Sequence, residues 1–322
     1  MATYQMHPER ATLHGAFSRD LPPVLTIQPG DTVRFQTLDA GWHIEPRRSA
    51  DPNERPQVFE PRDPERDAGH ALCGPVAIQG AEPGMTLAIH IDEIRPGSWG
   101  LTASGGWSSR VNTRMGVSEP PGIMHLWQLD ADAMTGRNQH GYEVALQPFM
   151  GVIGMPPDAP GWHSTVPPRV CGGNLDCREL VAGSTLYLPV SVAGALVSIG
   201  DGHAAQGDGE VSQTAIECPM ERVDLTFELV PDLRITTPRA ETPAGWVTMG
   251  VHEDLHEASM LALEAMLDLM GERYGLARLD ALALASVVVD LRVTQLVNGG
   301  VVGAHAVLPP GRLRAPEAPA SR

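Results

Sequence analysis

The sequence predicts an α+β fold that is mainly antiparallel β-structure, in sandwich-like β units, with a helical α/β segment near the C-terminus. Short apolar runs bounded by glycine and proline recur from residue 24 to residue 230, which is the pattern of strands and turns. Apolar residues at helical spacing appear only after residue 254. Two more strand-like runs, 291–297 and 301–308, follow that helical part.

The first hundred residues contain two pairs of predicted strands. The first pair is 24–27 and 32–37, and a proline-glycine turn separates its members. The second pair is 74–78 and 85–91, which we interpret as a hairpin, like the first. Between the pairs, residues 38–69 are rich in charged residues and proline, which indicates an irregular excursion.

Two glycine-rich stretches follow. Residues 98–109 are rich in Gly, Ser and Trp, and we interpret them as a surface loop that forms a lid or a wall of a pocket. The stretch 200–210, between the apolar run 186–199 and a strand-like run over 223–230, holds four glycines, three carboxylates, one imidazole and one side-chain amide. Glycine lets a ligand approach the backbone, and oxygen-rich side chains suit a divalent metal or a polar substrate. A Gly/Asp loop without chemistry is the alternative.

The C-terminal part shows the signals of two helices. Asp254 and Glu257 have the spacing of a capping box, and apolar residues at helical spacing follow them. Gly275 stands where a helix would end. Asp280 then caps a second predicted helix over 281–288.

These elements suggest a division of the chain into four parts. We expect an N-terminal β-rich unit, a central β unit that carries the Gly-Gly-Asn and Gly-Asp-Gly-His motifs, a C-terminal α/β unit, and a disordered tail. Their boundaries are 1–100, 101–235, 236–310 and 311–322.

Composition excludes several classes of protein. The formal net charge of −16 disfavours binding to nucleic acid and to anionic membranes. The sequence has no run of about 18 apolar residues that would span a membrane. The first ten residues lack the apolar core of a signal peptide, so we expect a cytoplasmic protein.

The sequence contains no lysine, because all 23 of its Lys and Arg residues are arginine. This excludes Schiff-base chemistry, pyridoxal phosphate attachment and the P-loop lysine. It also excludes the lysine-dependent Cys-Glu-Lys and Ser-Ser-Lys amidase sites.

Four cysteines, at 73, 171, 177 and 218, are expected to be reduced thiols, because their spacing fits no redox pair or zinc knuckle. Cys171 lies beside glycines and is the chemical rival as a nucleophile. It would need an adjacent base and a lowered pKa.

Several segments resemble, in order along the chain, those of the acetamidase/formamidase family. Residues 171–176 are similar to its Gly-Gly-Asn-x-Asp element, and Met85 replaces the aspartate that closes another of its motifs. The other similar segments are 74–84, 149–156, 182–190 and 200–210, with further similarity in the C-terminal helix and strand. The resemblance implies hydrolysis of short aliphatic amides with release of ammonia. It also implies a homo-oligomer, a dimer or tetramer.

Amide hydrolysis needs an activated water or nucleophile, stabilisation of the oxyanion, and a proton for the leaving ammonia. Without lysine or a Gly-x-Ser-x-Gly elbow, we expect water activated by a metal or by a carboxylate. We assign catalysis to Asp201, His203, Glu210 and Glu217, substrate binding to Asn174, Asp176 and Gln206, and metal binding to His203, Asp208 and Glu210. Glu217 is either the general base or a buried, hydrogen-bonded strand residue.

The expected cofactor is a divalent metal, with no organic cofactor. Zinc is favoured if His203 binds it, whereas the oxygen-rich set also suits calcium. The glycine-rich loop could instead hold the carboxylates through backbone amides, with no metal. The alternative function is a non-catalytic β-sandwich that binds a small ligand, or a carbohydrate in a calcium-dependent way.

Overall fold

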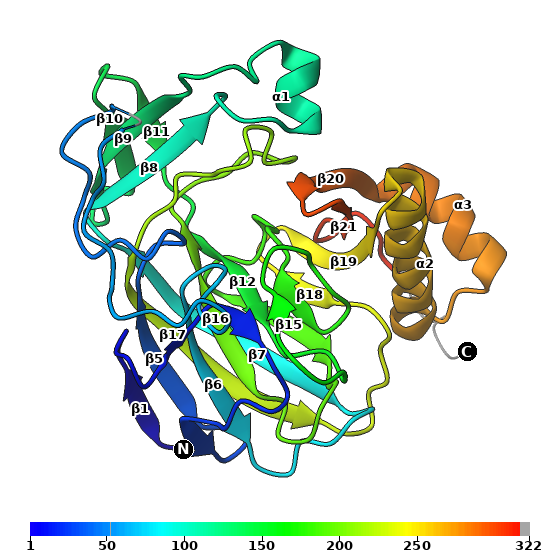
Figure 1. The fold of residues 1–322 in the computed structure, drawn as a ribbon. Coiled ribbons are helices and arrows are strands. Elements are labelled where there is room, and N and C mark those ends of the chain that lie inside the picture. Colours follow the sequence, from blue (N-terminus) through cyan, green and yellow to red (C-terminus); the bar gives the residue numbers. More distant parts are fainter. Residues whose placement is uncertain (52, 316–322) are drawn as a thin grey trace, which may run out of the picture.

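Two large β-sheets dominate the computed structural model, which describes residues 1–51 and 53–315 (Figure 1). The larger sheet has nine strands in the order β1-β5-β17-β7-β15-β18-β19-β21-β20. These strands are Thr3–Met6, Thr32–Thr37, Met220–Val230, Thr86–Pro96, Ser184–Pro189, Arg239–Thr242, Gly245–His252, Val301–Leu308 and Asp290–Asn298. Neighbours in this sheet are antiparallel except for β1 and β5, which are parallel.

The second sheet has six strands, and its apolar face packs against the first. Its main path is β14-β12-β16-β6-β2, and β4 pairs with β6 in parallel. These strands are Gly172–Asn174, Phe149–Gly154, Val197–His203, Leu72–Ile78, Leu13–His14 and Leu25–Ile27. Fully buried side chains from both sheets, such as Ile89 of β7 and Ile199 of β16, belong to one continuous core.

A smaller part of the molecule stands at one end of the two sheets (Figure 1). It contains a four-stranded antiparallel sheet and the short helix α1, Arg110–Met115. The strands β8 to β11 are Trp99–Ser104, Ile123–Asp130, Thr135–Asn138 and Glu143–Ala145. Outside these sheets, the two-residue strands β3 (Ala16–Phe17) and β13 (His163–Ser164) pair with each other as a small antiparallel sheet. Backbone hydrogen bonds between Leu101 and Glu217 join β8 to the main body.

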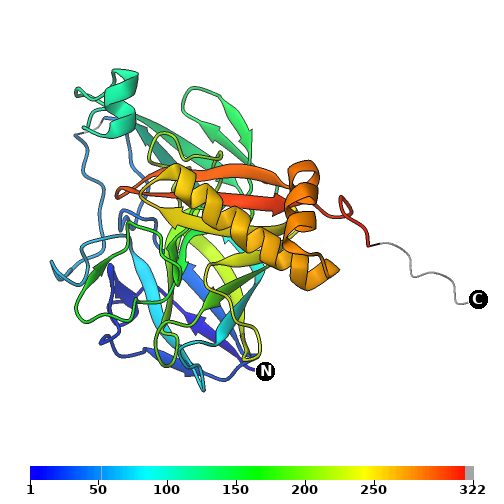
Figure 2. The same cartoon turned by 90° about the vertical axis from the view of Figure 1, so that its right-hand side faces the viewer.

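The long helix α2, Leu255–Tyr274, lies across the C-terminal strands of the larger sheet (Figure 2). Asp254 caps it by accepting hydrogen bonds from two backbone amides, and Gly275 ends it in the left-handed conformation, as predicted. The helix approaches β19 closely at Gly250, where an added Cβ would lie 2.0 Å from the carbonyl oxygen of Ala258. The second helix, α3, is Arg278–Val288 and packs beside α2.

The predicted fold class is confirmed, since most elements of the described residues are antiparallel strands and two of their three helices follow residue 254. The two C-terminal strands are also confirmed. Among the described residues, no helix has the length and apolarity that crossing a membrane requires.

Three local predictions are wrong. The paired runs of the N-terminal part are not hairpins, because β4 and β6 belong to the smaller sheet while β5 and β7 belong to the larger one. The stretch 98–109 is not all loop, since it begins with β8, which pairs with β9 along its whole length. Asp280 does not cap α3, because the helix begins two residues earlier, after Ala277.

The nine-stranded sheet takes strands from each of the three units expected from the sequence. β1, β5 and β7 come from 1–100, β15 and β17 from 101–235, and the other four strands from 236–310. The boundaries themselves stay predictions. Of the tail expected to be disordered, residues 316–322 lie outside the described part of the chain.

Candidate active site

Asp201 and His203 lie at the C-terminal end of β16, two residues apart and therefore on the same face of the strand. The predicted loop over 200–210 thus begins as a strand, because this segment pairs with β12 as far as Phe149 opposite His203. The alternating glycines lie where neighbours come close: a Cβ on Gly200 would be 2.2 Å from the carbonyl oxygen of Ala71. The Gly-x-Gly-x pattern therefore buries one face of the strand and presents two titratable side chains on the other.

His203 stands at the centre of the site, with a side chain that is 1% exposed. Its Nε2 lies 3.3 Å from Asp201 Oδ1 and 3.2 Å from Glu217 Oε2. Its Nδ1 lies 2.9 Å from Gln206 Oε1 and 3.7 Å from Asp176 Oδ1. Since a side-chain amide oxygen only accepts, this arrangement holds a proton on Nδ1 while two carboxylates face Nε2.

Asp176 reaches the site from the turn that follows β14. Its Oδ2 accepts a hydrogen bond from the side-chain amide of Asn298, at the end of β20, and its backbone carbonyl accepts one from Gln206 Nε2 at 2.9 Å. Its Oδ1 is buried and has no hydrogen-bond partner among the described residues. One oxygen is therefore fixed in place while the other points toward His203 unsatisfied.

Two glutamates complete the cluster from the segment after β16. Glu217 is held by isolated bridges to Leu101 and His203, and its Oε1 accepts from the backbone amide of Ala215 at 2.8 Å. Glu210 is also buried, and within the described residues its Oε2 has no hydrogen-bond partner. Glu217 therefore has the buried strand-like environment that the sequence allowed, and it also contacts the imidazole.

Three of the four acids occupy a backbone conformation that non-glycine residues rarely adopt. The φ angles of Asp176, Asp201 and Glu210 are 49°, 57° and 44°. Such conformations cost roughly 1–3 kcal/mol each and persist only where the surroundings enforce them. The strain is concentrated on the residues that converge on His203.

Burial and neighbouring charges shift the pKa values of the carboxyl groups away from their usual range. Burial raises the pKa of Asp176 to about 7, with His203 opposing and Asp201 reinforcing the shift. Burial, then Asp176, raises the pKa of Glu210 well above its usual value, and burial also raises the pKa of Glu217. Such displaced and separated values are typical of catalytic carboxyl pairs.

For Asp201 and His203, neighbouring charges outweigh the effect of burial on the pKa. Burial alone would raise the pKa of Asp201, but the charges of His203 and His70 outweigh it and hold that pKa below the usual value. Burial alone would lower the pKa of His203, but Glu217 and Asp201 outweigh it and raise that pKa well above the usual value. In the absence of a metal, these two shifts favour an imidazolium with an ionised aspartate beside it.

Gly151 of β12 makes room for this cluster. An added Cβ there would lie 2.6 Å from Asp176 Oδ1, 2.7 Å from Asp201 Oδ2 and 2.9 Å from His203 Cε1. Real Cβ atoms do not approach other atoms so closely. The two carboxylates and the imidazole therefore occupy the space that a side chain at position 151 would fill.

The cluster offers two overlapping sets of donors for a metal ion. They are Asp176, His203 and Glu210, and Asp201, His203 and Glu217, and within each set the ligand atoms lie within 4.8 Å of one another. Asp176 Oδ1 and Glu210 Oε2, which have no hydrogen-bond partner within the described residues, fit a cation, since a buried carboxylate oxygen without a partner is costly. The predicted ligand Asp208 is not in either set, because its residue is exposed.

The predicted substrate-binding amides make internal contacts. Gln206 bonds His203 and the backbone of Asp176. Asn174 donates to the carbonyl of Val166 at 3.1 Å, and the described residues show no hydrogen bond from it to the cluster.

Cys171, the rival nucleophile, is buried and its thiol donates to the carbonyl of Met155 at 3.3 Å. Burial raises the pKa of this thiol, whereas a nucleophile needs a lowered pKa.

A cavity of about 340 Å³ leads from the surface to Glu210. The glycine-rich segment forms one side of it, with Gln206 and the exposed Asp208. Thr102 of β8 and Trp127 of β9 line another side. The expected pocket wall at 98–109 thus exists, but a strand provides it.

The sequence analysis missed two residues of the site. Gly151 lies in the segment 149–156, which the sequence marks only by its resemblance to the family and not by any titratable side chain. Asn298 precedes two glycines between the last two strands, so it has the signature of a turn residue and gives no sign of a long-range contact.

The family model and a solved structure that match this chain both concern acetamidases or formamidases. The model of the "Acetamidase/Formamidase family" matches residues 2–164 and 158–311. The crystal structure of an acetamidase from Bacillus halodurans has a TM-score of 0.81 and 27% identity, covering 95% of this chain and 97% of that one.

Two curated relatives match over a shorter span. A Schizosaccharomyces pombe protein with a provisional formamidase name is 29% identical over 256 residues, 63% of this chain and 60% of that protein. A formamidase of Methylophilus methylotrophus is 25% identical over 253 residues, 62% of this chain and 60% of that protein. The chain thus matches 60% of the length of these relatives.

Proposed function

Since the chain belongs to the acetamidase/formamidase family, we propose that it hydrolyses the C–N bond of short linear amides, such as formamide and acetamide, at the cluster around His203. The observation that carries this proposal is the convergence of four buried carboxyl groups with separated pKa values on one imidazolium. A non-catalytic β-sandwich that binds a small ligand, or a carbohydrate in a calcium-dependent way, would not need a buried imidazole among these carboxyl groups, so the binding alternative is not favoured.

We propose that Glu217 moves the proton. Its Oε2 takes a proton from the attacking water while the water oxygen bonds to the amide carbon. The same oxygen then gives that proton to the amide nitrogen, and the C–N bond breaks to release ammonia and the carboxylic acid. The raised pKa of Glu217, which burial causes, supports this role because proton transfer is most efficient for a group with a pKa near the working pH.

The other members of the cluster position the reacting groups. Asp201 faces Nε2 of His203 and keeps the ring oriented. Gln206 holds the opposite nitrogen of the ring and the backbone of Asp176. Asn174 keeps its expected role as a substrate ligand only through its Oδ1, the atom that bonds no described residue.

We propose that a divalent cation, zinc or calcium, is held by Asp176, His203 and Glu210. The unpartnered Oδ1 of Asp176 and Oε2 of Glu210 support this set, and Nε2 of His203 faces carboxylates, as the second nitrogen of a metal-bound imidazole usually does. The cation would take the place of the Nδ1 proton, because a metal binds only the neutral ring. Such a cation supplies Lewis acidity and lowers the pKa of water toward about 7.

The test is release of ammonia from formamide and acetamide, before and after chelator treatment and with zinc or calcium restored. We expect activity that falls on chelation and returns with one of the ions. An active protein that never loses activity to chelators would remove the metal from the proposal. Absence of ammonia from every short amide, with metal restored, would overturn the proposed function itself.

Replacing Glu217 by glutamine tests the proton transfer. Glu217→Gln should lower kcat by about 10²–10⁴-fold, because the amide cannot carry the proton, while the melting temperature changes little. Glu228→Gln, the same change at an exposed glutamate of β17, is the control and should keep full activity. Equal kcat for the two variants would show that Glu217 only shapes the strand.

Homo-oligomerisation and a cytoplasmic location are also proposals. An apolar groove of about 870 Å³ between α1 and the C-terminal strands, lined by Met115, Val117 and Leu296 among others, supports association. The four cysteines are buried free thiols, which supports a reducing compartment. Light scattering of the purified protein would give the number of subunits, with a monomer contradicting the first proposal.

A further inference from the structure

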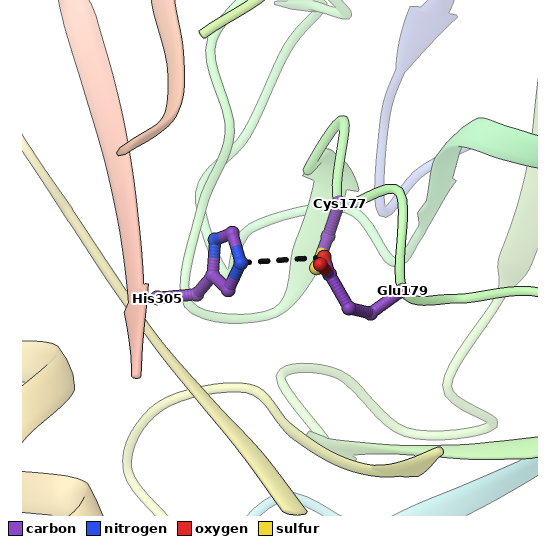
Figure 3. A group of neighbouring side chains, drawn as sticks. All are labelled: Cys177, Glu179 and His305. Carbon is purple, nitrogen blue, oxygen red and sulfur yellow. Dashed lines mark hydrogen bonds and ion pairs between the residues drawn. The ribbon is translucent and has the colours of Figure 1, made fainter. Parts of the chain in front are cut away.

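A second group of buried side chains lies beside the proposed active site but belongs to other elements. Cys177 and Glu179 come from the turn after β14, and His305 comes from β21 (Figure 3). Figure 3 shows the imidazole pointing across the gap toward the thiol and the carboxylate. The three residues are 0%, 5% and 0% exposed.

The three ligand atoms lie at the spacing of a metal's coordination shell. Glu179 Oε2 is 3.4 Å from Cys177 Sγ and 3.3 Å from His305 Nε2, and all three atoms lie within 4.8 Å of one another. Bonds of about 2.0–2.3 Å to zinc place tetrahedral ligands roughly 3.3–3.8 Å apart. The two measured edges fall in that range.

The imidazole is held ready to bind. Its Nδ1 lies 2.8 Å from Thr294 Oγ1 on the neighbouring strand, which fixes the ring. Its Nε2 is buried and, within the described residues, has no hydrogen-bond partner although Glu179 is close. A ring with one nitrogen held by a neighbouring oxygen and the other directed at the candidate ligands is the usual arrangement of a metal-bound histidine.

Charge also favours a cation here. A thiolate and a carboxylate together carry two negative charges, and a neutral imidazole adds none. Arg292 donates to Glu179 Oε1 at 3.0 Å, so it leaves Oε2 to face the thiol and the imidazole. A divalent cation would balance the thiolate and the carboxylate.

We propose that Cys177, Glu179 and His305 bind a zinc-class divalent metal, at a site separate from the cluster around His203. Sulfur and nitrogen donors select zinc over calcium or magnesium. The metal would join the turn that carries Asp176 to β21, next to the strand whose end supplies Asn298. Its role is therefore to hold a wall of the active site, with one position left for a water.

Cysteine ligation gives this site a signature that the His203 cluster cannot produce, because that cluster contains no sulfur. The purified full-length protein is loaded with cobalt(II), and the near-ultraviolet charge-transfer absorption of a cobalt–thiolate bond is recorded. We expect this band in the native protein. Cys177→Ser should lose it together with about one equivalent of bound metal per chain, measured by elemental analysis.

Cys171→Ser is the matched control, because Cys171 is also buried and its thiol donates to a backbone carbonyl, outside the group of three ligands. It should keep the band and the metal. A band that survives in Cys177→Ser would overturn the proposal, as would its absence from the native protein.

X-ray absorption of the zinc-loaded native protein makes the test independent of whether a variant folds. One sulfur at about 2.3 Å from zinc is expected. A shell of nitrogen and oxygen alone would place the metal only at the His203 cluster and overturn the second site. Neither measurement depends on amidase activity. A protein that is inactive but shows a zinc–sulfur bond would overturn the proposed function and still support this site.

Discussion

At the scale of single residues, the site depends on the absence of a side chain as much as on the acids. The space in front of Gly151 is taken by oxygens of Asp176 and Asp201 and by the ring of His203. These three groups are buried and held by neighbours, so they cannot move away from an added methyl without losing their arrangement.

Gly151→Ala should therefore lower kcat by about 100-fold or more, since a shift of about 1 Å in a catalytic group costs that much. Gly207→Ala is the control, because a Cβ there meets nothing within 4 Å. The measurement is kcat with acetamide for both variants. Normal turnover by Gly151→Ala would mean that the arrangement of these three groups does not matter for catalysis.

The raised pKa of Asp176 makes the stability of the metal-free protein depend on pH. Burial raises this pKa from 3.8 to about 7, so between these values the folded chain holds a proton that the unfolded chain releases. The stabilisation is fully present below pH 3.8 and is lost as the pH rises through about 7.

Melting temperatures of chelator-treated protein measured from pH 4 to pH 8 check this. The melting temperature of the native sequence relative to Asp176→Asn should fall as the pH rises, because asparagine cannot ionise. The difference between the native sequence and Asp208→Asn, at an exposed position, should stay constant. A constant difference for Asp176→Asn as well would contradict the raised pKa.

At the scale of elements, the close contact between α2 and β19 explains how the C-terminal strands are fixed. Gly250 lies on β19 under the helix, where a Cβ would be 2.0 Å from the carbonyl of Ala258 and 2.7 Å from the amide of Ala262. Thr248 Oγ1 also donates to the carbonyl of Ala262 at 2.7 Å. The helix therefore rests on the backbone of the strand itself.

Gly250→Ala should destabilise the protein by about 1–3 kcal/mol or more, because the methyl group must push the helix away. Gly271→Ala, in α2, provides the contrast. Its Cβ would meet nothing nearer than 3.4 Å, and alanine favours a helix over glycine by roughly 0.5–1 kcal/mol. Denaturant unfolding should give opposite signs for the two changes, and a neutral Gly250→Ala would show that α2 packs more loosely.

At the scale of the whole molecule, the active site is assembled from four distant parts of the chain. β12, the turn after β14, the segment from β16 to Glu217, and the end of β20 each supply one side of it. Its side chains are buried and packed closely, as the short distances from a Cβ at Gly151 show, so they leave space for few substrate atoms beside them. The site therefore favours a small acyl group.

We expect kcat/KM to fall by at least about tenfold from acetamide to butyramide, because each added methylene must find space against buried groups. Ammonia release across formamide, acetamide, propionamide and butyramide measures this, with equal enzyme and restored metal. A rise in kcat/KM with chain length, or activity confined to aromatic amides, would contradict a small site.

The sequence by itself determined the elements whose causes are local. The capping residue Asp254, the terminating Gly275 and the helical spacing between them specify α2, and period-two alternation specifies β5. The density of acids and glycines over 200–210 also identified three residues that do converge, Asp201, His203 and Glu210. Hydrogen bonds within a few residues and the period of a strand are properties that neighbours in sequence are enough to set.

Only the tertiary structure decided which of the acids meet. Asp208 lies between members of the cluster in sequence yet is exposed, whereas Asp176 and Asn298 are 122 residues apart and share a hydrogen bond. Only the tertiary structure likewise places Gly151 beside the cluster and brings Cys177, Glu179 and His305 together. Burial, which moves these pKa values and leaves oxygens without partners, arises when the two sheets pack together, and no local pattern records that contact.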